Sequence, residues 1–250
     1  MGTSAPPVAA AESPAPQSFP ARFLGVFVSP RETFADIARR PDFIAPLIVL
    51  ILVSIAASEV VLAKINLASI VRSQIEHSSR ASSMTPEQMQ QAVEQGSRIG
   101  AIFGHVGFLF VAIGLLIIAA ICLAVVNAIF GGGINFKMAL AVTCYANLVT
   151  VLMSLIVVAV VLFGDAEHFN PQSPAPTNPG FFLNPNETPK PLLSLAGSLD
   201  VFTLWVIALL GVGFSEATGR KVKTASLTLT IFGVWLIWVL IKMGFSTLGG

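Results

Sequence analysis

Charged residues are scarce in this chain of 250 residues: Lys, Arg, Asp and Glu together make up 11% of it, whereas 54% of the residues are apolar. Soluble domains carry about twice that share of charge, so the composition excludes an ordinary water-soluble protein. The formal net charge of +1 lacks the basic footprint that nucleic-acid binding requires, which excludes nucleic acid as a partner. The composition is that of an integral membrane protein.

Enzyme and cofactor motifs are also absent. The chain contains no HExxH, GxSxG or GxxxxGK[ST] sequence, and its three histidines lie far apart. Both cysteines, Cys122 and Cys144, lie inside apolar runs, where a small buried side chain is favoured over a disulfide, metal ligand or redox group. We therefore predict no enzyme activity, no catalytic residue, and no bound cofactor or metal.

The N-terminal segment is rich in Pro, Ala and Ser and lacks the charged and apolar regions of a signal peptide. We expect a disordered cytoplasmic tail over residues 1–28. Ser29 and Pro30 then predict a helix start, with Glu32 closing a capping box. That helix should run to about Arg40, either along the membrane surface or as a solvated lead-in to the first span.

Five apolar segments follow, each near or above the roughly 20 residues that a helix needs to cross a bilayer. They cover residues 43–64, 99–130, 138–163, 195–216 and 224–244. The second is longer than a span requires, so it should tilt or project beyond the membrane. The sequence predicts an all-α, polytopic membrane protein with five transmembrane helices in one domain, residues 29–246.

The segments that connect the predicted spans also contain sequence patterns that predict local structure. Gly131, Gly132 and Gly133 predict a tight turn between the second and third spans. Thr85 and Pro86 predict the start of a helix that runs into the second span, and a Pro-rich irregular loop should join the third span to the fourth. In the fourth span, Gly211 and Gly213 allow a neighbouring helix to approach closely.

The distribution of lysine and arginine predicts how the protein is oriented in the membrane, because cytoplasmic loops carry more of these residues than loops on the other side. One side holds basic clusters that touch helix ends directly: Arg31, Arg39, Arg40, Lys137, Arg220, Lys221 and Lys223. The other side carries cations spread along longer loops: Lys64, Arg72, Arg80, Arg98, Lys190 and Lys242. We therefore expect the N-terminus in the cytoplasm and the C-terminus outside.

Three ionisable residues, Glu59, His105 and Asp200, fall within or near the outer ends of the predicted spans at similar depth. Because such groups are costly in hydrocarbon, they are candidates for a proton-coupled site or an ion pathway. The alternative is structural. Ser198 would cap the fourth helix with Asp200 in its first turn, and Glu59 would bind a partner or water near the interface.

The order of these features resembles the Yip1 domain family, whose members have a cytoplasmic N-terminal region followed by five transmembrane helices. The resemblance covers residues from about 28 to 243, on the stretches SPRETFADIARRPDF, GGGINFKMALAVTCYANL and SLDVFTLWVIALLGVGFSEATGRKVKTA. Asp42 and Pro46 keep the two ends of a D-L-Y-G-P-like motif of eukaryotic members, and Tyr145 keeps the tyrosine of a G-Y motif. The departures are typical of a prokaryotic branch, which implies a bacterial cytoplasmic membrane.

The resemblance implies a non-enzymatic membrane scaffold or adaptor, which binds other membrane or membrane-associated proteins or shapes the bilayer. The implied partners are lipid, other membrane proteins or further copies of the chain; a small GTPase follows only if the eukaryotic role carries over. The residues expected to bind a partner are Asp42, Pro46, Tyr145, Arg220, Lys221 and Lys223. The alternative is a transporter or channel for a small solute or ion that uses Glu59, His105 and Asp200.

Overall fold

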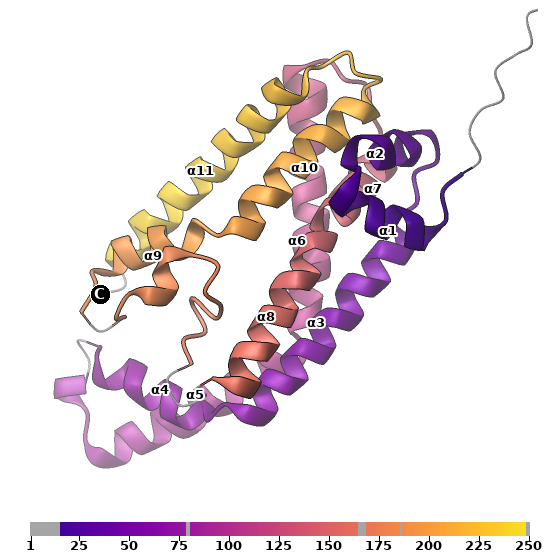
Figure 1. The fold of residues 1–250 in the computed structure, drawn as a ribbon. Helices are drawn as coiled ribbons and strands as arrows, with labels where there is room; N and C mark the ends of the chain where they lie inside the picture. Colours follow the sequence, from indigo (N-terminus) through magenta and orange to yellow (C-terminus); the bar gives the residue numbers. More distant parts are fainter. Residues whose placement is uncertain (1–15, 79–80, 165–168, 186, 249–250) are drawn as a thin grey trace, which may run out of the picture.

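The computed structural model describes residues 16–78, 81–164, 169–185 and 187–248, and in these residues the chain forms helices and loops without strands (Figure 1). The N-terminal half contains α1 (Phe19–Val28), α2 (Pro30–Arg39), α3 (Ile44–Lys64), α4 (Leu67–Glu76), α5 (Pro86–His105) and α6 (Gly107–Ala124). The C-terminal half contains α7 (Phe136–Ala146), α8 (Thr150–Phe163), α9 (Lys190–Ser198), α10 (Val201–Ala217) and α11 (Thr224–Leu248). Short turns of 3₁₀ or π helix lie at Ala81–Ser83, Val125–Ile129, Asn147–Val149 and Pro179–Phe182.

Four helical stretches are long and apolar enough to cross a membrane: Ile44–Lys64, Gly107–Ile129, Phe136–Phe163 and Thr224–Ser246. The pair α9 and α10 forms a fifth if it is counted as one span, although its two helices are bent by 49°. The all-α polytopic fold predicted from the sequence is therefore confirmed.

Two predicted spans have a different course from the expected one. The second was expected as one helix over residues 99–130, but the chain breaks at Val106, and residues 99–105 are the last turns of α5. This helix begins at Thr85, where Gln88 completes a capping box, as the sequence predicts. Because α5 packs against α3 and α4 rather than continuing along α6, the helical extension leads away from the span.

The fourth span, expected over residues 195–216, is interrupted at Asp200. This residue has an extended backbone and its carboxylate accepts the N–H groups of Phe202 and Thr203, so it starts a new helix as the N-cap of α10. Ser198, expected to be the cap, is instead the last residue of α9, and its hydroxyl donates to the Ser194 carbonyl. A capped start at Asp200 prevents α9 from continuing into α10 without a bend.

The tail expected over residues 1–28 is wrong from Phe19 onward, because residues 19–28 form α1. Phe19, Phe23 and Phe27 recur every four residues, and their rings contact one another in sequence along the helix. The same helix buries Arg22 and Val26. Residues 1–15, which hold most of the predicted tail, lie outside the described part of the chain.

Helix α7 is the centre of the packed core. Its residues from Ala139 to Ala146 are all buried, because α2, α6 and α10 surround the helix. A helix that is apolar on every side is expected to be enclosed in this way. In α8, the continuation of the same span, only Val161 is buried. The molecule is therefore tightly packed at one end and exposes apolar helix faces toward the other.

The two ends of the molecule are formed by different helices and loops (Figure 1). The end that we call the hairpin end consists of α1, α2, the loop 130–135 and the turn 218–223. The opposite end, which we call the loop end, consists of α4, α5, the loop 169–185 and α9. This division places the N-terminal helices beside the two short turns that the sequence assigns to the cytoplasm.

Candidate functional site

A buried ion pair lies at the hairpin end. Arg22 of α1 and Asp36 of α2 form two contacts of 2.8 Å, from the guanidinium Nε and Nη2 to Asp36 Oδ2, and their side chains are 6% and 2% exposed. Arg22 Nη1 also donates to the carbonyl of Arg40, at 3.3 Å. Buried charges persist only when paired and hydrogen-bonded, so this contact fixes α1 against α2 in one register.

The Asp36 carboxylate is held in its charged form. Burial by itself raises the pKa of Asp36, but hydrogen bonds and charge from Arg22, together with Arg39 and the backbone N–H of Gln17, outweigh burial. Its pKa therefore lies below the ordinary value of 3.8. The ion pair is complete at neutral pH.

Tyr145 of α7 lies beneath this ion pair. The Arg22 guanidinium carbon is 5.9 Å from the centre of the Tyr145 ring, and the Phe19 ring is 6.3 Å from it. Tyr145 is fully buried, and its hydroxyl has no hydrogen-bond partner among the described residues. The ring of the tyrosine singled out by the family resemblance thus lies within the range of a cation–π contact with Arg22.

Helix α2 is docked on the spans through its apolar face. Phe34 and Ile37 are fully buried, so the apolar face of α2 packs on protein and the helix is not fully solvated. Gly213 of α10 makes room for this contact, because a methyl group there would lie 2.5 Å from Val142 Cγ1 and 2.9 Å from Phe34 Cδ1. The close approach predicted at Gly211 and Gly213 is confirmed, the former against Thr228 of α11.

The N-terminus of α2 keeps only part of its predicted cap. Ser29 occupies the N-cap position and Pro30 follows it, but the Ser29 side chain makes no capping hydrogen bond. The hydroxyl of Thr33 instead donates to the Ser29 carbonyl, and Thr33 packs closely against Gly25 of α1. The short connection between α1 and α2 therefore depends on Gly25 and Thr33 rather than on a capping box.

The two short turns at the hairpin end lie against each other. Gly132 packs on Thr218, and Gly131, Gly133, Gly219 and Arg220 all have positive φ angles.

Asn127 closes the first turn, because its side chain accepts the N–H of Ile134 and donates to the carbonyl of the same residue. The tight turn predicted at the three glycines is confirmed. A cavity of about 360 Å³ lies between the turns, with Asn135 and Lys221 among its lining residues.

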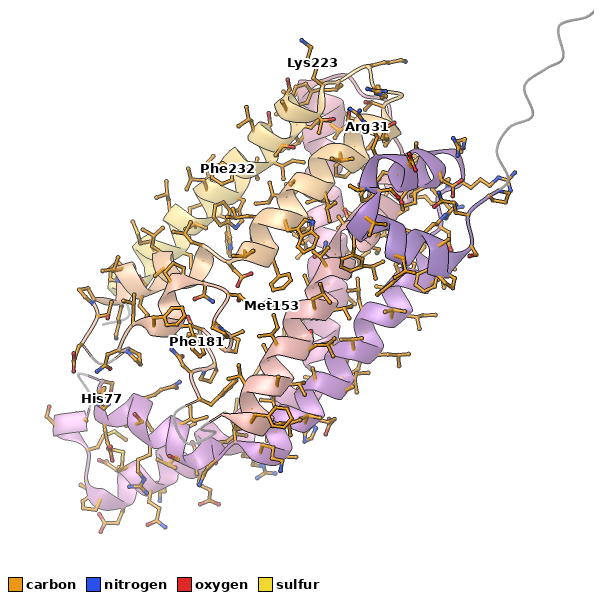
Figure 2. All side chains as sticks on the ribbon, in the orientation of Figure 1. Arg31, His77, Met153, Phe181, Lys223 and Phe232 are labelled. Carbon is orange, nitrogen blue, oxygen red and sulfur yellow. The ribbon has the colours of Figure 1, made fainter. Side chains whose placement is uncertain are left out.

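Glu216 connects the α10 end to α2. Its carboxylate lies 3.5 Å from Arg31 Nε and 3.7 Å from Arg220 Nε. The two arginine side chains are mostly exposed, so the contacts orient the surface more than they stabilise the fold. Arg31 and Lys223 both lie at this end of the molecule in Figure 2.

The six residues expected to bind a partner divide into two groups. Pro46 and Tyr145 are buried, and Asp42 accepts the backbone N–H of Ile44 at the start of α3. Arg220, Lys221 and Lys223 are exposed on the turn 218–223. Asp42 is partly exposed, and the second group is the more accessible to another molecule in this conformation.

Of the three ionisable residues that the sequence groups by depth, the structure brings two together. His105 Nδ1 lies 2.7 Å from Glu59 Oε1, joining the end of α5 to α3, and both side chains are about half exposed. Asp200 has separate partners: the Thr177 hydroxyl donates to Oδ2, while Oδ1 caps α10. Asp200 therefore ties the loop 169–185 to the fourth span.

Sequence reasoning missed α1 and the contact of Arg22 with Asp36. The signal was present in the four-residue recurrence of Phe19, Phe23 and Phe27. It was hidden because the Pro- and Ala-rich composition of the preceding residues continues to Pro20.

These features define a multi-pass α-helical membrane protein whose N-terminal helices are folded onto its spans. The chain belongs to the Yip1 domain family: the model of the Yip1 domain matches residues 24–245, so the resemblance found in the sequence is confirmed. No curated protein and no solved structure shows a significant match to the chain. The match begins inside α1, which agrees with α1 being part of the folded domain.

Proposed function

We propose that this protein is a non-enzymatic membrane scaffold or adaptor that binds other membrane or membrane-associated proteins through its hairpin end. The observation that carries the proposal is the buried contact of Arg22 with Asp36, which holds α1 and α2 on α7 and α10. Exposed cations of separate segments are thereby presented on a fixed support. Rigid presentation favours binding, because fewer side chains and loops must be ordered on association.

The charge of this surface suggests the chemistry of the partner. The exposed cations are Arg31 and Arg39 of α2, Arg40 directly after it, Lys137 of α7, and Arg220, Lys221 and Lys223 of the turn. Two acids of the same end are already engaged, Asp36 with Arg22 and Glu216 with Arg31 and Arg220. An acidic segment of another membrane protein would complement this surface, and the anionic cytoplasmic leaflet would support it.

The family-motif residues have a positioning role in this proposal. The Tyr145 ring lies against the Arg22 guanidinium. Asp42, which is partly exposed, and Pro46, which is buried, lie at the beginning of α3 beside the N-terminal helices. They would affect binding by holding the surface in place. Direct contact is assigned to Arg220, Lys221 and Lys223.

The test compares two triple variants of the full chain, purified in a mild detergent with their bound partners. The first replaces Arg220, Lys221 and Lys223 by Gln. The matched control replaces three exposed cations away from the hairpin end, Lys64 at the end of α3, Arg72 of α4 and Arg98 of α5. We expect the first variant to lose partners that the wild type and the control retain. Absence of partners above background in the wild type, or equal loss in both variants, would reject the proposal.

The alternative of a transporter or channel remains a prediction. The contact between Glu59 and His105 would suit a proton-coupled site. Asp200, however, is already bound by Thr177 and by the backbone of α10. Proton flux in liposomes that disappears in Glu59→Gln would raise this alternative above the scaffold.

A further inference from the structure

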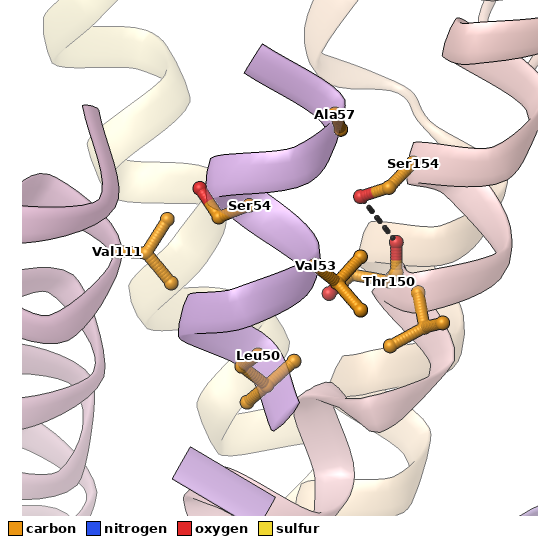
Figure 3. A pocket seen from close by; sticks show the side chains of 8 residues that line it. Leu50, Val53, Ser54, Ala57, Val111, Thr150 and Ser154 are labelled. Atoms are coloured by element: carbon orange, nitrogen blue, oxygen red, sulfur yellow. Dashed lines mark hydrogen bonds between the residues drawn. The ribbon is translucent and has the colours of Figure 1, made fainter. Parts of the chain in front are cut away.

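A cavity lies between α3, α6 and α8, in the part of the molecule that the spans place inside the bilayer (Figure 3). Its volume is about 150 Å³. Ser54, the middle residue of α3, lines it, as does Thr150, which lies near the middle of the span Phe136–Phe163. The cavity is therefore close to the bilayer midplane.

Three hydroxyl groups line this otherwise apolar cavity. Thr150 Oγ1 donates to the Asn147 carbonyl at 2.7 Å, and Ser154 Oγ donates to the Thr150 carbonyl at 3.2 Å. Each of these hydroxyls therefore keeps lone pairs that can accept a hydrogen bond. The remaining lining residues are Leu50, Val53, Ala57, Val111 and Val151.

The Ser54 hydroxyl has no hydrogen bond to another described residue. An unpaired hydroxyl in the hydrocarbon region costs free energy, because that region contains no water with which the hydroxyl could form a hydrogen bond. A polar molecule in the cavity would satisfy Ser54 and would donate to Thr150 and Ser154. The cavity thus has a specific chemical reason to be occupied.

The backbone beside the cavity is irregular. The third span changes to a 3₁₀ turn at Asn147–Val149, immediately before Thr150. Irregular backbone at membrane depth is tolerated where protein or a polar cavity surrounds it, and interrupted helices commonly form solute sites near the midplane. The turn and the hydroxyl cluster therefore point to the same location.

We infer that this cavity is a hydrated binding site for a small, neutral, hydroxyl-bearing solute. The lining contains no charged residue, which disfavours an ion, and it combines apolar walls with hydroxyl groups, which suits a short polyol. A cavity of about this size holds a molecule as large as benzene, and glycerol is comparable. The site is separate from Glu59, His105 and Asp200 and goes beyond the proposed scaffold function.

Cysteine reactivity tests the inference in the full chain, after Cys122 and Cys144 have been replaced by Ala. Ala57→Cys places a thiol on the cavity lining without removing a hydroxyl, and Leu52→Cys places one on the same helix at a side chain that is 59% exposed. A water-soluble thiosulfonate reagent reacts with a thiolate, which requires water. We expect Ala57→Cys to react roughly tenfold faster or more than Leu52→Cys, and glycerol to slow only the former.

A second pair of variants tests the hydroxyl chemistry. Thr150→Val, in the Ala57→Cys background, removes a lining hydroxyl with little change in shape and should weaken protection by glycerol. Thr230→Val is the control, because Thr230 makes the same type of bond, to the Ser226 carbonyl, on α11 outside the cavity. Each variant is first shown to elute as a monodisperse species in detergent.

The outcomes are decisive in either direction. Equal, slow labelling at both cysteines would mean that the cavity is dry and would overturn the inference. Fast labelling of Ala57→Cys that glycerol does not slow, or that sodium ions slow instead, would reject a neutral polyol site. Glycerol protection that survives Thr150→Val would reject the role assigned to the hydroxyls.

Discussion

Arg22 Nη2 lies 2.8 Å from Asp36 Oδ2, and the two side chains belong to helices that precede the first membrane span. Through this contact, α1 and α2 become part of the membrane domain rather than a flexible extension of it. The position of the basic surface at the hairpin end depends on the same contact.

Asp36→Asn should destabilise the domain, because it leaves the Arg22 guanidinium buried without its counter-charge. The expected loss of stability is about 3 kcal/mol. This value is near the lower end of the range for breaking a buried ion pair, because Arg22 keeps its hydrogen bond to the Arg40 carbonyl. Thermal unfolding in lipid nanodiscs measures the effect. Glu32→Gln, on the exposed side of the same helix, is the control and should unfold like the wild type.

The pH dependence of stability follows from the lowered pKa of Asp36. A carboxyl with a lowered pKa in the folded state stabilises that state fully above its unfolded pKa and loses this contribution as pH falls through the folded pKa. The contribution of Asp36 to stability should therefore be complete at neutral pH and should decline as pH falls below the ordinary pKa of 3.8. Unfolding followed from pH 7 to pH 3 should show this acid decline in the wild type and a smaller one in Asp36→Asn. Identical declines would contradict the assignment.

Gly213→Ala should separate α10 from α7 and α2. The added methyl group would press on Val142 and on the Phe34 ring, and overpacking of this kind costs about 1–3 kcal/mol. Gly233→Ala on α11 is a matched control, because a methyl group there has no atom within 4 Å. A Gly213→Ala protein with the melting temperature of Gly233→Ala would disprove the tight contact.

Asn127→Leu should loosen the turn at the hairpin end. The substitution keeps the size of the side chain but removes both bonds to Ile134, and the loss of such partly buried hydrogen bonds costs about 1 kcal/mol. Amide hydrogen exchange at residues 131–135 measures the loosening directly. Unchanged exchange would mean that the glycines alone hold the turn.

Orientation can be measured with single cysteines at the two ends. Lys223→Cys at the hairpin end and Glu94→Cys in α5 are both exposed. With the N-terminus in the cytoplasm, an impermeant maleimide added to intact cells should label Glu94→Cys and spare Lys223→Cys. The reverse pattern would place the basic surface outside and would remove the anionic cytoplasmic leaflet from the proposed function.

The candidate site was only partly visible in the sequence. Tyr145 was identified through a family motif, but its partner Arg22 lies in a segment whose Pro- and Ala-rich surroundings predicted disorder. Likewise, Glu59 and His105 were grouped by depth and do form a pair, whereas Asp200, grouped with them, has other partners. Depth along a helix can be counted from residue numbers, but the direction in which a side chain points depends on helix packing.

The sequence by itself determined the class of protein and the number of apolar segments, because the length and hydropathy of a run decide whether it can cross a bilayer. It also determined the central turn and the capped start of α5, since glycine and capping residues act on their immediate neighbours. Only the tertiary structure decided that the chain breaks at Val106 and Asp200, that α1 and α2 dock on α7 and α10, and that Ser54 and Thr150 face one cavity. These features depend on contacts between residues far apart in the chain, whose energies no local pattern records.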